Sequence, residues 1–155
     1  MKENFKRAVL LLSITIALPT ISIAQEKIET DISADLLSGY IWRGQDLGNI
    51  SIQPTLSLSY KGFSLSAWGT VGFEGKDTKE LDLTLGYTTG GFSISVTDYW
   101  FDGGPGYFHY GSNHTNHTFE AQMGYDFGPL AINWYTNFAG YDGINKNGDR
   151  AYASY

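Results

Sequence analysis

The sequence predicts an all-β protein: an antiparallel up-and-down transmembrane β-barrel with about eight visible strands, incomplete at its C-terminus. Three observations lead to this fold class: apolar and polar residues alternate, short and long connections alternate, and aromatic residues gather near the expected strand ends. Alternation with a period of two is the signal of a strand whose two faces differ. We find no helical amphipathic stretch of useful length, so we expect strands alone.

The N-terminal residues 1–24 are expected to be a signal peptide. Three cations precede an apolar run from Ala8 to about Leu18, and small residues stand just before Gln25. This is the order of features that signal peptidase recognises. The apolar run of roughly eleven residues is too short for a helix across about 30 Å of hydrocarbon. We therefore expect export and a barrel domain over residues 25–155.

Seven stretches are expected to be strands, and an eighth begins near Arg150 and stops at Tyr155. In chain order they span residues 28–43, 50–60, 63–73, 80–88, 92–101, 115–127 and 130–139. Their apolar faces carry Ile28, Ile32 and Leu36; Ile52, Leu56 and Leu58; Leu65, Ala67 and Val71; Leu81, Leu83 and Leu85; Ile94 and Val96; Ala121 and Met123; Leu130, Ile132 and Trp134. Pro54 is an exception, because in mid-strand its missing N–H leaves a ladder carbonyl unpaired unless there is a bulge.

The connections between these strands alternate in length. Lys61-Gly62, Thr89-Gly90-Gly91 and Gly128-Pro129 are short, whereas residues 44–49, 74–79, 102–114 and 140–149 form longer loops. In an antiparallel meander this places every short turn at one end and every long loop at the other. Outer-membrane barrels have this asymmetry.

Aromatic residues on the apolar face form two bands. The expected girdle beside the short turns is Tyr60, Phe63, Tyr87, Phe92, Tyr125 and Phe127, and the one beside the long loops is Tyr40, Trp42, Phe73, Trp100 and Phe138. Amphipathic rings settle at the headgroup level of a bilayer. We therefore expect the apolar face to contact outer-membrane lipid. The alternative is a soluble secreted lipocalin-like binder whose apolar face points inward.

The polar face is then expected to enclose the lumen. Candidate lumen and mouth residues are Arg43, Gln53, Trp68, Glu80, Asp82 and Glu120. An unpaired buried carboxylate is costly. Arg43 has inward parity near the external mouth, so we expect it to neutralise one or more of these acids, with Glu120 or Asp82 as the partner.

The stretch "SGYIWRG" at residues 38–44, with "IQPTLSLSYKGFSLSAWGTVGF" and "ELDLTLGYTTGGFSISVTDYWF", resembles the TorF-type porins of Gram-negative outer membranes. The shared elements are a strand ending in Tyr-x-aromatic-Arg-Gly, a proline after the first loop, Trp68-Gly69 and an "ELDLTLGY" strand. They run in the same order from about residue 31 to 140. The resemblance implies an outer-membrane β-barrel with a pore, and no catalytic residues.

The chain departs from that family at its end, because family members are longer and "NGDRAYASY" stops about four residues short of a full strand. We expect a truncated sequence. The alternative is a complete barrel of eight strands, whose interior is about filled by side chains.

Several function classes are disfavoured by composition. The formal net charge is −6 and no basic stripe is present, which argues against a nucleic-acid partner. The absence of cysteine removes disulfides, thiolate metal sites and cysteine nucleophiles. His109, His114 and His117 lack carboxylates at ligand spacing, so we expect exposed loop histidines, and neither a metal nor a cofactor. Serines fall on the polar parity, which disfavours an outer-membrane lipase.

We therefore expect a non-enzymatic protein of the cell outer membrane that lets small polar solutes diffuse passively, with an acidic lumen that mildly favours cations. The alternative within the membrane is a small closed barrel with a structural or surface-binding role carried by residues 102–114 and 140–149.

Overall fold

The computed structural model describes residues 27–111 and 115–141. The expected signal peptide and the expected strand near Arg150 lie outside these residues. The elements are β1 Glu29–Leu37, β2 Tyr40–Trp42, β3 Gln45–Gly48, β4 Ser51–Tyr60, β5 Phe63–Gly72, β6 Lys79–Thr89, β7 Phe92–Phe101, β8 His117–Asp126 and β9 Ala131–Gly140. The all-β prediction is confirmed, since the described part of the chain contains no helix. Within it, no helix is long and apolar enough to cross a membrane.

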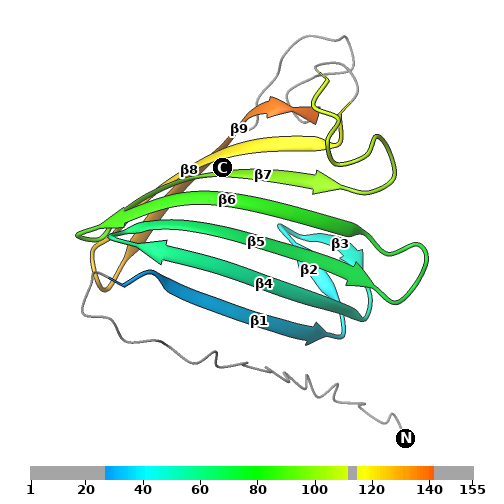
Figure 1. Cartoon of the computed structure of the whole chain (residues 1–155), viewed down its shortest axis with the longest axis horizontal. Coiled ribbons are helices and arrows are strands. Elements are labelled where there is room, and N and C mark those ends of the chain that lie inside the picture. The colour runs from blue at the N-terminus through cyan, green and yellow to red at the C-terminus, as the bar shows by residue number, and fades with distance from the viewer. Residues whose placement is uncertain (1–26, 112–114, 142–155) are drawn as a thin grey trace, which may run out of the picture.

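Seven strands form one antiparallel sheet in the order β1-β4-β5-β6-β7-β8-β9, which is the expected meander (Figure 1). The short turns after β4, β6 and β8 lie at one end of this curved sheet, and the long connections lie at the other (Figure 1). Strands β1 and β9 are the two edges of the sheet. The closed barrel that we expected is therefore not seen within the described ranges.

The expected strand over residues 28–43 is wrong beyond Leu37. The chain leaves the sheet at Ser38 and forms a separate antiparallel hairpin, β2–β3, which lies on the concave side of the sheet (Figure 1). Its turn residues Arg43 and Gly44 have φ angles of 46° and 80°. Positive φ at both central residues is the mark of the turn that joins two strands with the natural twist of a hairpin. The expected long loop at 44–49 thus contains strand β3.

Pro54 lies in the middle of β4 without the bulge that we considered. It faces Ala34 in the ladder with β1. On the other side, the ladder with β5 pairs Ile52 with Val71 and resumes at Thr55 with Trp68, so the register is the same before and after the proline. The missing N–H is accommodated by a local gap in the pairing, and no extra residue is inserted.

The two faces of the sheet have the reverse polarity of a water-soluble protein. The convex face carries exposed aliphatic side chains, among them Leu56, Leu65, Leu85, Ile94 and Ile132. The concave face carries the buried polar groups, which include Ser51, Gln53, Thr70, Glu80, Thr97, Thr118, Glu120 and Asn137. Among the described residues, Tyr99 is the only hydrophobic residue that is buried. The expectation that the apolar parity faces outward and the hydroxyl-rich parity faces inward is therefore correct.

Candidate functional site

The hairpin β2–β3 is held against the concave face by an ion pair between Arg43 and Glu120. Arg43 Nη1 lies 2.7 Å from Glu120 Oε2, and Nη2 lies 3.0 Å from Oε1. Two parallel N–H···O bonds of this kind fix orientation as well as distance. The side chain of Arg43 is 25% exposed and that of Glu120 is 0% exposed. The expectation that Arg43 pairs with an acid across the wall is confirmed, with Glu120 as the acid.

Neutral groups on the wall complete the surroundings of the Glu120 carboxylate. The Tyr99 hydroxyl and the Gln122 amide donate hydrogen bonds to Oε1, at 3.1 and 3.2 Å. The same amide also approaches Thr97 Oγ1 at 3.2 Å. A buried carboxylate is tolerated only when its acceptor sites are filled, and here a cation and two neutral donors fill them.

Aromatic rings flank the guanidinium of Arg43. Its central carbon lies 4.3 Å from the ring centroid of Trp42 and 5.1 Å from that of Tyr135 in β9. Trp42 in turn packs on Tyr99, with ring centroids 5.8 Å apart. A guanidinium over an aromatic face gains electrostatic attraction, and more so where water is excluded. The tip of the hairpin is therefore bound to β7, β8 and β9 together.

A second polar contact ties the base of the hairpin to β6. The Tyr40 hydroxyl donates to Glu80 Oε2 at 2.8 Å, and the ring of Tyr40 packs on Trp68 at 5.7 Å. Burial, and then the negative charge of Glu80, raise the pKa of the Tyr40 phenol well above its ordinary value. The phenol therefore stays a hydrogen-bond donor. Asp82, two residues along the same face, has a buried Oδ1 without a hydrogen-bond partner in the described ranges.

All six predicted lumen and mouth residues belong to the concave side. Arg43, Glu80 and Glu120 join the hairpin to the wall as described, and Asp82 lies beside Glu80. Gln53 is buried and donates to Thr70 Oγ1 at 3.3 Å. Trp68 supports Tyr40. The contacts thus bring together Arg43 and Glu120, whereas Gln53 belongs to a separate hydrogen-bonded group on β4 and β5.

Two members of the expected girdle are wrong. Tyr40 and Trp42 are not on the outer face, because their rings pack on the concave-side residues Trp68 and Tyr99. Their outward orientation was predicted from the alternation of residues along one continuous strand. The chain leaves the sheet at Ser38, so that alternation no longer applies to them. The remaining members belong to the outward parity near the two ends of the strands: Tyr60, Phe63, Phe73, Tyr87, Phe92, Trp100, Tyr125, Phe127 and Phe138.

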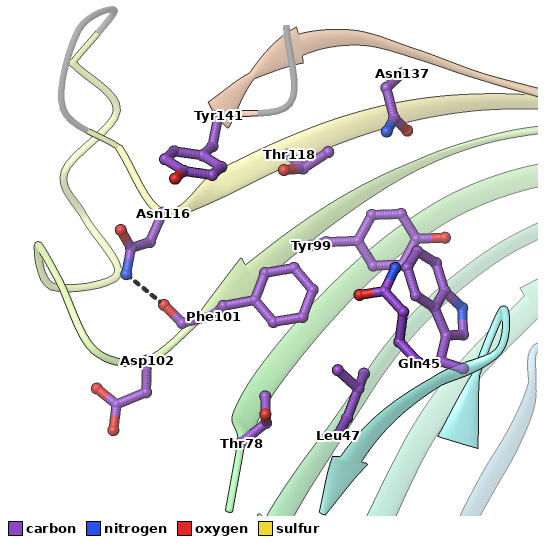
Figure 2. Close-up of a pocket in the computed structure, with 11 residues that line it drawn as sticks. Gln45, Leu47, Thr78, Tyr99, Phe101, Asp102, Asn116, Thr118, Asn137 and Tyr141 are labelled. Atoms are coloured by element: carbon purple, nitrogen blue, oxygen red, sulfur yellow. Dashed lines mark hydrogen bonds between the residues drawn. The ribbon is translucent and has the colours of Figure 1, made fainter. Parts of the chain in front are cut away.

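A cavity of about 460 Å³ lies between the hairpin and the loop ends of β6 to β9, and we call it the mouth cavity. Figure 2 shows the ring of Phe101 beside that of Tyr99, and the ring of Tyr141 near the end of β9. Gln45 and Leu47 extend into the cavity from β3. Asn116 Nδ2 donates to the carbonyl of Phe101 at 2.7 Å. The described residues that line it are Trp42, Gln45, Leu47, Thr78, Tyr99, Phe101, Asp102, Asn116, Thr118, Asn137 and Tyr141.

Residue counting missed most of this cavity. Tyr99 was recognisable, because it shares the polar parity of Thr97 and is an aromatic residue on that face, as Trp68 is. Gln45 and Leu47 carried no signal, because a hairpin folded into the concave face cannot be distinguished from a loop by alternation. Asn137 reaches the cavity from β9, which pairs with β8 through an irregular register at Phe119 and Glu120.

The described residues 102–111 and 115–116, between β7 and β8, pack on the convex face around His117. His117 is fully buried, its Nδ1 lies 2.7 Å from Asp98 Oδ1, and its Nε2 faces the carbonyl of Tyr107. The ring of Tyr110 stacks on the imidazole with centroids 4.0 Å apart. Both ring nitrogens therefore face oxygen atoms of neighbouring residues.

The expectation of exposed loop histidines is therefore wrong for His117 and correct for His109. His114 lies outside the described residues. Where the structure describes the chain, no group of three or more His, Cys, Asp or Glu side chains could hold a metal ion.

No protein-family model, no curated protein and no solved structure matches this chain.

The Arg43–Glu120 pair is expected to dominate the stability of the hairpin. Arg43→Ala should lower the free energy of unfolding by about 3 kcal/mol, because it leaves a buried carboxylate without its cation. A double-mutant cycle of Arg43→Ala and Glu120→Ala in urea titrations should give a coupling of at least about 1 kcal/mol. The control is Lys76 and Glu74, which are 3.3 Å apart with side chains 77% and 52% exposed. That pair should couple by only about 0–1 kcal/mol, and equal coupling in the two pairs would contradict the assignment.

The His117 contacts are expected to protect the loop from proteolysis. His117→Ala removes two hydrogen bonds and a stacked ring, so chymotrypsin should cleave after Phe108 or Tyr110 roughly tenfold faster, as expected for a loss of about 1.4 kcal/mol. His109→Ala removes an exposed ring and should leave the rate unchanged. Mass spectrometry of the fragments measures the rate of cleavage at each site. Equal rates in the two variants would show that His117 does not hold the loop.

Proposed function

We propose that this chain is an outer-membrane β-barrel protein of the TorF-type porin class that lets small polar solutes diffuse passively. The single observation that supports the proposal most strongly is the reversed polarity of the sheet, with aliphatic side chains exposed on the convex face and polar groups buried on the concave face. Monomeric soluble proteins rarely expose apolar patches larger than a few hundred Å². A lipid environment removes that penalty, because acyl chains are as apolar as the side chains themselves.

Strand length and the shape of the connections agree with this proposal. Each strand from β4 to β9 has 10 or 11 residues, which suits a tilted crossing of a bilayer. Short turns at one end and long loops at the other are typical of outer-membrane barrels. The open edges, β1 and β9, mean that the proposed barrel needs further strands to close it. The exported precursor with a signal peptide over residues 1–24 belongs to the same proposal.

The charges of the concave face favour cations over anions. Glu80, Asp82 and Glu120 lie there, and Arg43 is paired with one of them. A ring of acids in a narrow aqueous path raises the local concentration of cations. The proposed pore therefore carries small polar solutes, with a mild preference for positive charge.

A second candidate function is a closed barrel with a structural or surface-binding role. The observation that favours it is the hairpin itself, because β2 and β3 occupy part of the concave side and are bound to β6 and β8 by side-chain contacts. A small barrel filled in this way encloses no continuous water path. Conductance separates the two candidates, since only the first carries current.

The lipid-facing assignment predicts a difference between two exposed aliphatic residues. Leu83, in the middle of β6, is 37% exposed, and Ile41 on the hairpin is 72% exposed. Leu83→Arg should destabilise the protein in lipid vesicles by about 2–4 kcal/mol, the cost of an arginine at the bilayer midplane. Ile41→Arg should change stability by less than about 0.5 kcal/mol, because its neighbourhood is aqueous. Urea titration in vesicles measures both, and two equally small effects would argue for water around the convex face.

The pore assignment predicts a selective current. The full-length protein in planar bilayers should conduct, and a potassium chloride gradient should give a reversal potential of cation-selective sign. At a pH high enough to ionise both carboxyls, the double change Glu80→Gln and Asp82→Asn should move that potential toward zero. Asp126→Asn, beside a short turn, is the matched control and should leave it unchanged. Insertion without current would support the closed barrel, and failure to enter bilayers would contradict both candidates.

A further inference from the structure

We propose that the mouth cavity is a binding site for a neutral saccharide. This inference deepens the proposed function, because it names a class of solute that would be held where the long loops meet the concave face. The cavity volume of about 460 Å³ falls within the range of about 300–1,000 Å³ that is usual for small-ligand sites.

The lining combines aromatic faces with neutral hydrogen-bonding groups. Trp42, Tyr99, Phe101 and Tyr141 contribute aromatic rings from the hairpin, from β7 and from the residue that follows β9. A sugar ring has an apolar C–H face that can lie against such rings, and burial of that face against aromatic carbon is favourable. The aromatic rings therefore suit one side of a pyranose.

Amides and hydroxyls supply the complement to the sugar's hydroxyl groups. Gln45, Asn116 and Asn137 each carry a donor and an acceptor, and Thr78 and Thr118 carry hydroxyls that do both. A sugar hydroxyl also both donates and accepts, so a side-chain amide can form a hydrogen bond with it either as donor or as acceptor. A purely apolar ligand would offer no hydrogen bond to Gln45, Thr78 or Thr118, and polar groups that lose water without gaining a partner cost free energy.

The charge of the lining argues against an ionic ligand. Asp102 is the one charged residue among the lining residues that the structure describes, and its Oδ2 lies 3.5 Å from Lys79 Nζ. The nearest guanidinium, Arg43, is engaged with Glu120. An anion would meet no cation among the described residues of the lining, and a cation would meet a carboxylate that is already paired with Lys79. A neutral ligand rich in hydroxyls remains the best chemical match.

Phe101 is held in position for such a contact. Its backbone carbonyl accepts from Asn116 Nδ2 at 2.7 Å, and its backbone N–H donates to the carbonyl of Asn116 at 3.2 Å. Its ring lies beside that of Tyr99 in Figure 2. A preorganised ring loses little conformational freedom when a ligand binds.

The test is isothermal titration calorimetry of the full-length protein with maltose, sucrose and lactose. We expect at least one sugar to bind, and Phe101→Ala to raise its Kd by roughly tenfold. Phe108→Ala is the matched control, because Phe108 is 90% exposed on the loop outside the cavity and should leave the Kd unchanged. Glycine betaine, a zwitterion, serves as the ionic solute and should not bind.

A second variant keeps the test decisive if Phe101→Ala fails to fold. Gln45→Ala removes an exposed amide of the hairpin without altering the wall, and it should also weaken sugar binding several-fold. Absence of binding by all three sugars, or binding that neither cavity variant weakens, would overturn the inference. Conductance without sugar binding would refute the saccharide site while leaving the pore intact, whereas absence of conductance with sugar binding would refute only the pore.

Discussion

A carboxylate that is fully buried must be given partners, and in this protein that requirement shapes one end of the molecule. Glu120 projects from β8 into the concave side, where Tyr99 and Gln122 satisfy part of its hydrogen-bonding capacity. The charge itself needs a cation, and the wall strands do not supply one at that position. The hairpin β2–β3 brings Arg43 to it. The mouth cavity exists because the same hairpin, once fixed, contributes Trp42, Gln45 and Leu47 to its lining.

A carboxylate on the convex face, that of Asp98, also requires partners, and a histidine and a tyrosine supply them. Asp98 lies on the outward parity of β7, opposite Leu83 of β6 and Phe119 of β8. It is paired with His117 and also accepts from the Tyr110 hydroxyl at 3.4 Å. The loop that carries Tyr107 and Tyr110 covers this polar pair. In a lipid environment such a cover would spare the bilayer an exposed carboxylate, for which the cost is high.

Because of these two arrangements, additional segments pack on both faces of the sheet at the end that carries the long loops. The hairpin narrows the concave side and sets acids opposite a single guanidinium, while the long loop closes over the outer wall. For a pore, this would place the selective region and the candidate sugar site near one another at the mouth. For a closed barrel, the same contacts would act as a plug. In both cases the pair of Arg43 and Glu120 joins the hairpin to the concave face.

The sequence by itself determined the sidedness of the sheet. Successive residues of a strand point to opposite faces whatever surrounds them, so local counting correctly assigned Leu83, Ile94 and Ile132 to one face and Thr84 and Gln122 to the other. The same counting placed Glu120 on the concave side, whereas Arg43 reaches Glu120 through the turn of the hairpin. Short turns were also visible, since Gly62, Gly91 and Gly128 have positive φ where turns of that length require it.

Only the tertiary structure decided where the chain leaves the sheet and what then covers it. Alternation continues through residues 28–43 although β1 ends at Leu37, and a turn at Arg43 with positive φ has no signature in a pattern of period two. As a result Tyr40 and Trp42, expected outside, pack inside on Trp68 and Tyr99. Likewise, His117 is buried and paired with Asp98 only because residues distant in sequence pack around it. These contacts join residues distant in sequence, and their energy depends on a surface that exists only after the strands have paired.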